Sequence, residues 1–80
     1  MKNTNYAAVT SMTFVNTTTR NAFWTIRLAV HNRPTVTTMF GALGTAGQKR
    51  VKSFESREEA REYVAAKIDE KLGRFYVQVA

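Results

Sequence analysis

The sequence contains no cysteine, and only one histidine, one proline and one tryptophan, among its 80 residues. Small secreted domains usually depend on disulfides, so the lack of cysteine favours a reducing compartment and predicts a cytoplasmic protein. No apolar run follows Lys2 as it would in a signal peptide. The longest apolar run, YVAA at 63–66, is far too short to cross a bilayer, so a soluble protein without a membrane partner is expected.

Catalytic and metal-binding motifs are missing as well. His31 has no second histidine, cysteine or suitably spaced carboxylate with which to share a metal, and no serine stands in a nucleophile elbow. Next to Asn32, His31 is typical of a surface turn. We therefore predict no enzyme, no catalytic residue, no metal site and no cofactor.

Acidic residues are confined to one part of the chain. All six lie within residues 55–71 together with four bases, which gives that segment a charge of −2. The remainder carries eight bases and no acid, so its charge is +8, and the two parts sum to the net charge of +6. Such a polarised charge suits a polyanion on one side of the molecule, although a small basic protein can also be basic merely for solubility.

The length permits one domain, which we assign to residues 1–80. Four stretches are rich in β-branched and aromatic residues and predict strands, at residues 9–15, 22–30, 35–41 and 48–54. In the second stretch Trp24 and Ile26 fall on one face and Arg27 on the other, which is typical of a half-buried strand. On this basis Trp24 is predicted to be a core residue.

The hydrophobic period then changes to that of a helix, over residues 57–72. Ser56 and Glu59 form a capping box at its start, and Gly73 is a natural cap at its end. Its apolar stripe is predicted to consist of Ala60, Tyr63, Val64, Ile68 and Leu72. With residues 75–79 as a possible last strand, the fold class is α+β: an antiparallel sheet of four to five strands with one helix packed on one face.

Three glycines, Gly41, Gly44 and Gly47, are spaced three residues apart between the third and fourth strands. The spacing is not that of a dinucleotide-binding loop or a P-loop, and a strand follows instead of a helix. Glycines in such a hairpin loop supply backbone conformations with positive φ. We therefore interpret them as a turn and not as a phosphate cradle.

The segments NAFWTIRL, FGALGTAGQ and FESREEA together resemble a WGR domain, a module named for a Trp-Gly-Arg triplet. The resemblance covers about residues 14–76 and keeps the order of the elements. It implies a WGR-like fold and a small stand-alone, bacterial-type member. In the eukaryotic members of this family the domain binds DNA at strand ends. There the triplet's tryptophan packs on the terminal sugar and its arginine contacts neighbouring domains. Here Phe40 and Ala42 stand at those two positions, so the triplet is degenerate.

Basic residues near the glycine turn are the candidates for nucleic-acid binding. Arg50 and Lys52 share one side of their predicted strand, while Lys49 points away. If the other arginines converge on the same surface, a phosphate-binding patch results, with Phe40 as a stacking contact; the alternative is a solvated strand face. The candidate contacts are Arg20, Arg27, Arg33, Phe40, Lys49, Arg50 and Lys52.

Two functions follow as hypotheses. The first is a small nucleic-acid-binding module, with DNA favoured, that contacts phosphates from the sheet and loop side. The second is a protein-interaction module or homodimer with no role in nucleic-acid binding, which would use a sheet edge or exposed Met39 and Phe75. A regulatory role, described for some bacterial proteins with this domain, belongs with the second hypothesis.

Overall fold

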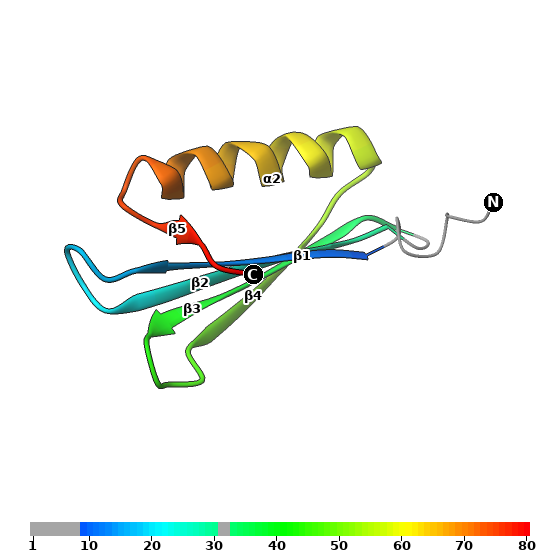
Figure 1. Cartoon of the computed structure of the whole chain (residues 1–80). Coiled ribbons are helices and arrows are strands. Elements are labelled where there is room, and N and C mark those ends of the chain that lie inside the picture. The colour runs from blue at the N-terminus through cyan, green and yellow to red at the C-terminus, as the bar shows by residue number, and fades with distance from the viewer. Residues whose placement is uncertain (1–8, 31–32) are drawn as a thin grey trace.

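The computed structural model describes residues 9–30 and 33–80 of the chain. Its elements are β1 (Val9–Asn16), β2 (Ala22–Ala29), β3 (Thr35–Ala42), β4 (Gln48–Ser53), α2 (Arg57–Leu72) and β5 (Val77–Gln78). The strands form one antiparallel sheet in the order β4-β3-β2-β1-β5, and α2 lies across one face (Figure 1). The predicted α+β fold is confirmed. The turn predicted at His31 and Asn32 lies outside the described residues.

Strand register divides the side chains between two faces of the sheet. Trp24 of β2 pairs with Phe14 of β1 and with Phe40 of β3, so all three point toward α2. Thr38 of β3, on this same face, pairs with Arg50 of β4. The intervening residues point away from α2, to what we call the open face, among them Thr25, Arg27, Thr37, Met39 and Lys49.

The core lies between α2 and the middle of the sheet. Trp24 is 3% exposed, which confirms its predicted place in the core, and its ring centroid lies 5.6 Å from that of Phe14. α2 packs chiefly over β2 and β3. The buried apolar side chains are Phe14, Ala22, Trp24, Ile26, Val36, Ala60, Val64 and Tyr76.

α2 begins where the capping signal predicts. The Ser56 hydroxyl accepts a hydrogen bond of 3.2 Å from the Glu59 backbone N–H. Ala60 and Val64 are buried, but the assignment of Leu72 to the apolar stripe is wrong, because its side chain is 51% exposed. A spacing of four residues overshoots a full turn by about 40°, so a fourth member of such a stripe lies about 120° around the helix from the first.

The turn between β3 and β4 has the backbone expected of its glycines. Gly44 has a φ of 87° and Gly47 a φ of 74°, both in the left-handed region. A Cβ atom at Gly47 would overlap the Phe40 carbonyl oxygen and lie 2.7 Å from Cζ of Phe23, whereas one at Gly44 would meet nothing within 4 Å. The close approach at Gly47 fixes the start of β4 against the end of β3.

Asn16 ties the loop after β1 to the turn after α2. Its side chain is 2% exposed, and its Nδ2 donates to Thr19 Oγ1 at 2.9 Å and to the Arg74 carbonyl oxygen at 3.0 Å. Its Oδ1 accepts from the N–H groups of Thr18 and Thr19 at 3.0 and 3.1 Å. These four bonds hold the segments carrying Arg20 and Arg74 beside each other.

Candidate nucleic-acid interface

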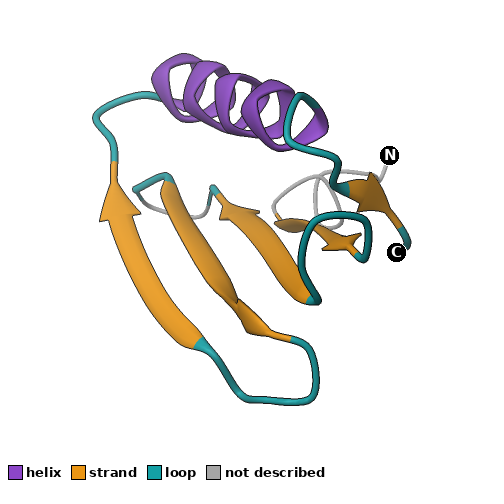
Figure 2. Cartoon of the chain, turned by 90° about the vertical axis from the view of Figure 1, so that its left-hand side faces the viewer, coloured by secondary structure: helices purple, strands orange, loops and turns teal. Residues whose placement is uncertain are grey.

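A groove of about 390 Å³ lies between α2 and β4, on the side of the sheet that α2 covers. It forms because α2 packs over β2 and β3, while β4 extends beyond the helix (Figure 2). β2 and β3 contribute the floor of the groove, and β4 and α2 contribute its two walls. The lining side chains include Trp24, Val36, Thr38, Phe40, Arg50, Lys52, Tyr63, Lys67 and Lys71.

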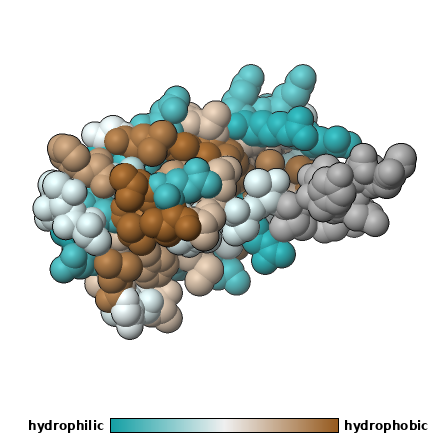
Figure 3. All heavy atoms as spheres, in the orientation of Figure 1, coloured by the Kyte–Doolittle hydropathy of each residue, from teal (hydrophilic) through white to brown (hydrophobic). Residues whose placement is uncertain are grey.

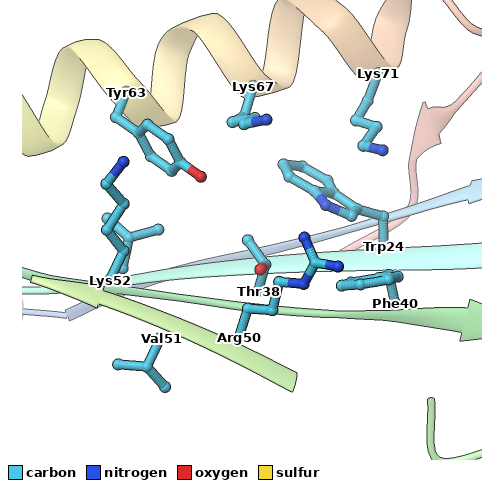
Figure 4. A pocket seen from close by; sticks show the side chains of 10 residues that line it. Trp24, Thr38, Phe40, Arg50, Val51, Lys52, Tyr63, Lys67 and Lys71 are labelled. Atoms are coloured by element: carbon cyan, nitrogen blue, oxygen red, sulfur yellow. The ribbon is translucent and has the colours of Figure 1, made fainter. Parts of the chain in front are cut away.

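Cations dominate this groove. Arg50 and Lys52 enter it from β4, and Lys67 and Lys71 from α2 (Figure 4). Within the described part of the chain, no aspartate or glutamate lines it. Four positive charges around one hollow create a positive potential that attracts anions, and the apolar floor strengthens that field.

Each of these four cations lies over an aromatic ring. The Arg50 guanidinium carbon is 5.2 Å from the centroid of Phe40. The Nζ atoms of Lys52 and Lys67 lie 5.0 and 5.6 Å from the centroid of Tyr63. Cation–π contacts of this kind contribute about 0.5–1 kcal/mol at exposed sites. They hold the charged groups toward the groove instead of leaving them free in solvent.

Lys71 lies between two aromatic rings. Its Nζ lies 5.4 Å from the ring of Trp24 and 5.3 Å from that of Tyr76. Burial lowers the pKa of Lys71 from its usual value of 10.5; Glu70 raises the pKa, and the neighbouring cations Arg74, Lys67 and Arg20 lower it. An anion bound beside Lys71 would relieve both the burial penalty and the repulsion between cations.

A second hollow of about 250 Å³ adjoins the groove at Lys71. Arg20, from the loop after β1, and Arg74, from the turn after α2, line it. Glu70 is the acid near this region, and it pairs with both Lys67 and Arg74 at 3.6 Å. These are partly exposed pairs that stabilise little, so an incoming anion can compete with Glu70.

The seven residues predicted from sequence do not form one patch. Phe40, Arg50 and Lys52 meet in the groove, with the Phe40 ring covered by Arg50. Arg20 lies in the adjoining hollow.

The remaining three lie elsewhere. Arg27 and Lys49 line a hollow on the open face, with Ser11, Thr25 and Thr37 around them. The predicted divergence of Lys49 from Arg50 and Lys52 is confirmed by the strand pairing. Arg33 is engaged by Glu55 at 3.3 Å, in an exposed ion pair.

Lys67, Lys71 and Arg74 were not among the residues predicted from sequence. The sequence nevertheless holds a signal for the two lysines. Counting 100° per residue, Lys67 and Lys71 each lie within about 20° of Ala60 around the helix. Since Ala60 of α2 is fully buried against the sheet, both lysines emerge from the side of the helix that faces the sheet.

The comparisons with known proteins agree with this architecture. A crystal structure of a protein from Bacteroides fragilis resembles this chain with a TM-score of 0.77 at 32% sequence identity, over 89% of this chain and 20% of that one. The chain thus spans about one fifth of that relative's length. Among curated proteins, none matches the sequence. No helix in residues 9–30 and 33–80 is long and apolar enough to cross a membrane. The sequence matches the WGR domain over residues 8–80, and the chain belongs to the WGR domain family.

Proposed function

We propose that this chain is a nucleic-acid-binding module that holds phosphates in the groove between α2 and β4. The observation that carries the proposal is the convergence of Arg50, Lys52, Lys67 and Lys71 on one hollow that no carboxylate of residues 9–30 and 33–80 lines. Phosphate contacts from lysine and arginine supply most of the affinity in non-specific nucleic-acid binding. The module binds and does not catalyse, and we place it in the cytoplasm because the chain lacks cysteine.

DNA is the favoured nucleic acid because of family membership. The tryptophan and arginine of the family's triplet are replaced here by Phe40 and Ala42. Arg50 lies over the Phe40 ring, so at this position the groove presents a guanidinium to its ligand and not an aromatic face. We therefore expect binding to depend on phosphate contacts and to be weakly dependent on base sequence.

The test is a fluorescence-anisotropy titration with labelled single-stranded and duplex DNA at low salt. Two double variants are compared with the unmodified protein, Arg50→Ala with Lys67→Ala in the groove and Arg27→Ala with Lys49→Ala on the open face. Both remove two positive charges, so the overall charge is the same and only its location differs. The groove variant should lose at least tenfold in affinity and the open-face variant only a small fraction of that. Equal losses, or no binding by the unmodified protein, would contradict the proposal.

A second candidate function is protein interaction, through an apolar patch at the end of the molecule where α2 stops and β5 begins (Figure 3). Leu72, Phe75, Val77 and Val79 are each more than half exposed there. Exposed apolar side chains gathered on one surface often mark a protein contact. Sedimentation at several concentrations, with Phe75→Ser as the variant, tests for a homodimer. A mass that stays monomeric up to high concentration would exclude self-association through this patch.

A further inference from the structure

The groove and the adjoining hollow share Lys71, so their cations form one continuous row beneath α2. We infer that this row is a track for the backbone of a single nucleic-acid strand, and not a seat for a duplex. The inference rests on the proposed function and names the form of nucleic acid that the site takes. We call the row the cation track; its members are Arg20, Arg50, Lys52, Lys67, Lys71 and Arg74.

The cation track consists of three pairs that follow one another. At one end Lys52 and Lys67 lie on Tyr63. In the middle Arg50 and Lys71 lie over Phe40 and Trp24, which are partners on neighbouring strands.

At the other end of the track, Arg20 and Arg74 face the hollow beyond Lys71. Each pair brings together one cation from α2, or the turn that ends it, and one from the sheet or its loops. A phosphate at each pair would therefore be held from two sides.

The spacing of the pairs suits a polynucleotide strand. Lys67 and Lys71 are four residues apart on α2, which is about 6 Å of rise, and Arg74 follows three residues later, about 4.5 Å further on. On β4, Arg50 and Lys52 are two residues apart, about 6.6 Å. A stacked strand advances by about 3.4 Å per nucleotide, so the track of about 10 Å corresponds to about three nucleotides.

The size and walls of the groove favour one strand over two. A volume of 390 Å³ lies near the lower limit of the roughly 300–1,000 Å³ found for small-molecule pockets. A hollow of this volume accommodates a short stretch of strand backbone and not a duplex, whose major groove alone is about 12 Å wide, so a duplex would reach only the outermost cations. Trp24 is buried and the faces of Phe40 and Tyr63 are occupied by cations, so the bases would point outward and would not be read.

The experiment measures binding of fluorescein-labelled oligothymidylates of 2, 4, 6, 10 and 20 nucleotides and of a 20-base-pair duplex, from 50 to 200 mM salt. Affinity should rise steeply up to about 4 nucleotides. Beyond that length it should rise only in proportion to the number of positions at which the track can bind along the oligonucleotide. Three neutralised phosphates predict a salt slope of about −2.1, which is about an 18-fold loss of affinity over that fourfold range of salt. The duplex should bind less tightly than the 20-nucleotide strand at every salt concentration.

Arg20→Ala breaks the outer pair by removing its member at an exposed loop position, so it tests the track without disturbing the core. In this variant the loss of affinity between 50 and 200 mM salt should fall to about 7-fold. In Lys49→Ala, on the open face, the loss of affinity should stay at about 18-fold. Unchanged salt dependence in Arg20→Ala, or a duplex that binds as tightly as the single strand, would overturn the track while leaving nucleic-acid binding intact. Absence of binding to both forms would instead overturn the proposed function itself.

Discussion

Gly47 is predicted to be far less tolerant of alanine than Gly44, although both have positive φ. A left-handed conformation costs an alanine about 1–2 kcal/mol. The stiffer unfolded chain returns about 0.4–1 kcal/mol of this. Gly44→Ala, with open space around the new methyl group, should therefore lower the free energy of unfolding by about 1 kcal/mol.

At Gly47 a steric cost is added, because the new methyl group would overlap the Phe40 carbonyl and the Phe23 ring. Overpacking of this kind costs about 1–3 kcal/mol, so Gly47→Ala should lower the free energy of unfolding by about 2–4 kcal/mol. Urea unfolding of the two variants measures the difference from the midpoints at constant slope. Equal losses in both variants would refute the close approach of Gly47 to Phe40, and with it the role of the turn in fixing β4.

Three further predictions concern stability. Asn16→Ala removes four hydrogen bonds from a buried side chain and should lower the free energy of unfolding by about 2–4 kcal/mol in urea; a loss below 1 kcal/mol would contradict the tether between the loop and Arg74. Burial lowers the pKa of Lys71, so the charged lysine destabilises the folded protein. This destabilisation is fully present below the folded pKa of Lys71, and the free energy of unfolding should rise as the pH climbs from there toward 10.5. Thermal melts across alkaline pH should show a smaller rise in Lys71→Met, which keeps the apolar stem; identical pH profiles would contradict the prediction. Leu72→Gln should change unfolding by no more than about 0.5 kcal/mol, since that side chain is half exposed, and a large loss would place it in the core.

The fold could be predicted from sequence because its local signals agree with one another. Alternation around Trp24 marks a half-buried strand, Ser56 and Glu59 mark the helix start, and the glycines mark the β3–β4 turn. Leu72 was misassigned because an apolar residue at a four-residue spacing was counted without the rotation that accumulates along a helix. Whether an apolar residue near the end of the helix is buried depends on how close its side chain lies to the sheet.

The candidate site was only partly predictable. Alternation in β4 separates Arg50 and Lys52 from Lys49, and the pairing confirms it. The sequence could not show that α2 leaves β4 uncovered, so Lys67 and Lys71 were not predicted as contacts. Nor could the sequence show that Arg33 pairs with Glu55, which lies 22 residues away and meets it only in the folded chain. Contacts between distant segments, and not local pattern, decide which cations share a surface.

The most direct test of the central claim is to map where nucleic acid binds by ¹H–¹⁵N correlation spectroscopy, which suits a 9.1-kDa protein. An oligothymidylate of six nucleotides is titrated into labelled protein at low salt. The groove predicts the largest shifts at Arg50, Lys52, Lys67 and Lys71, with the open-face residue Arg27 nearly unmoved. Shifts confined to the open face, or to the apolar patch around Phe75, would contradict a phosphate-binding groove between α2 and β4.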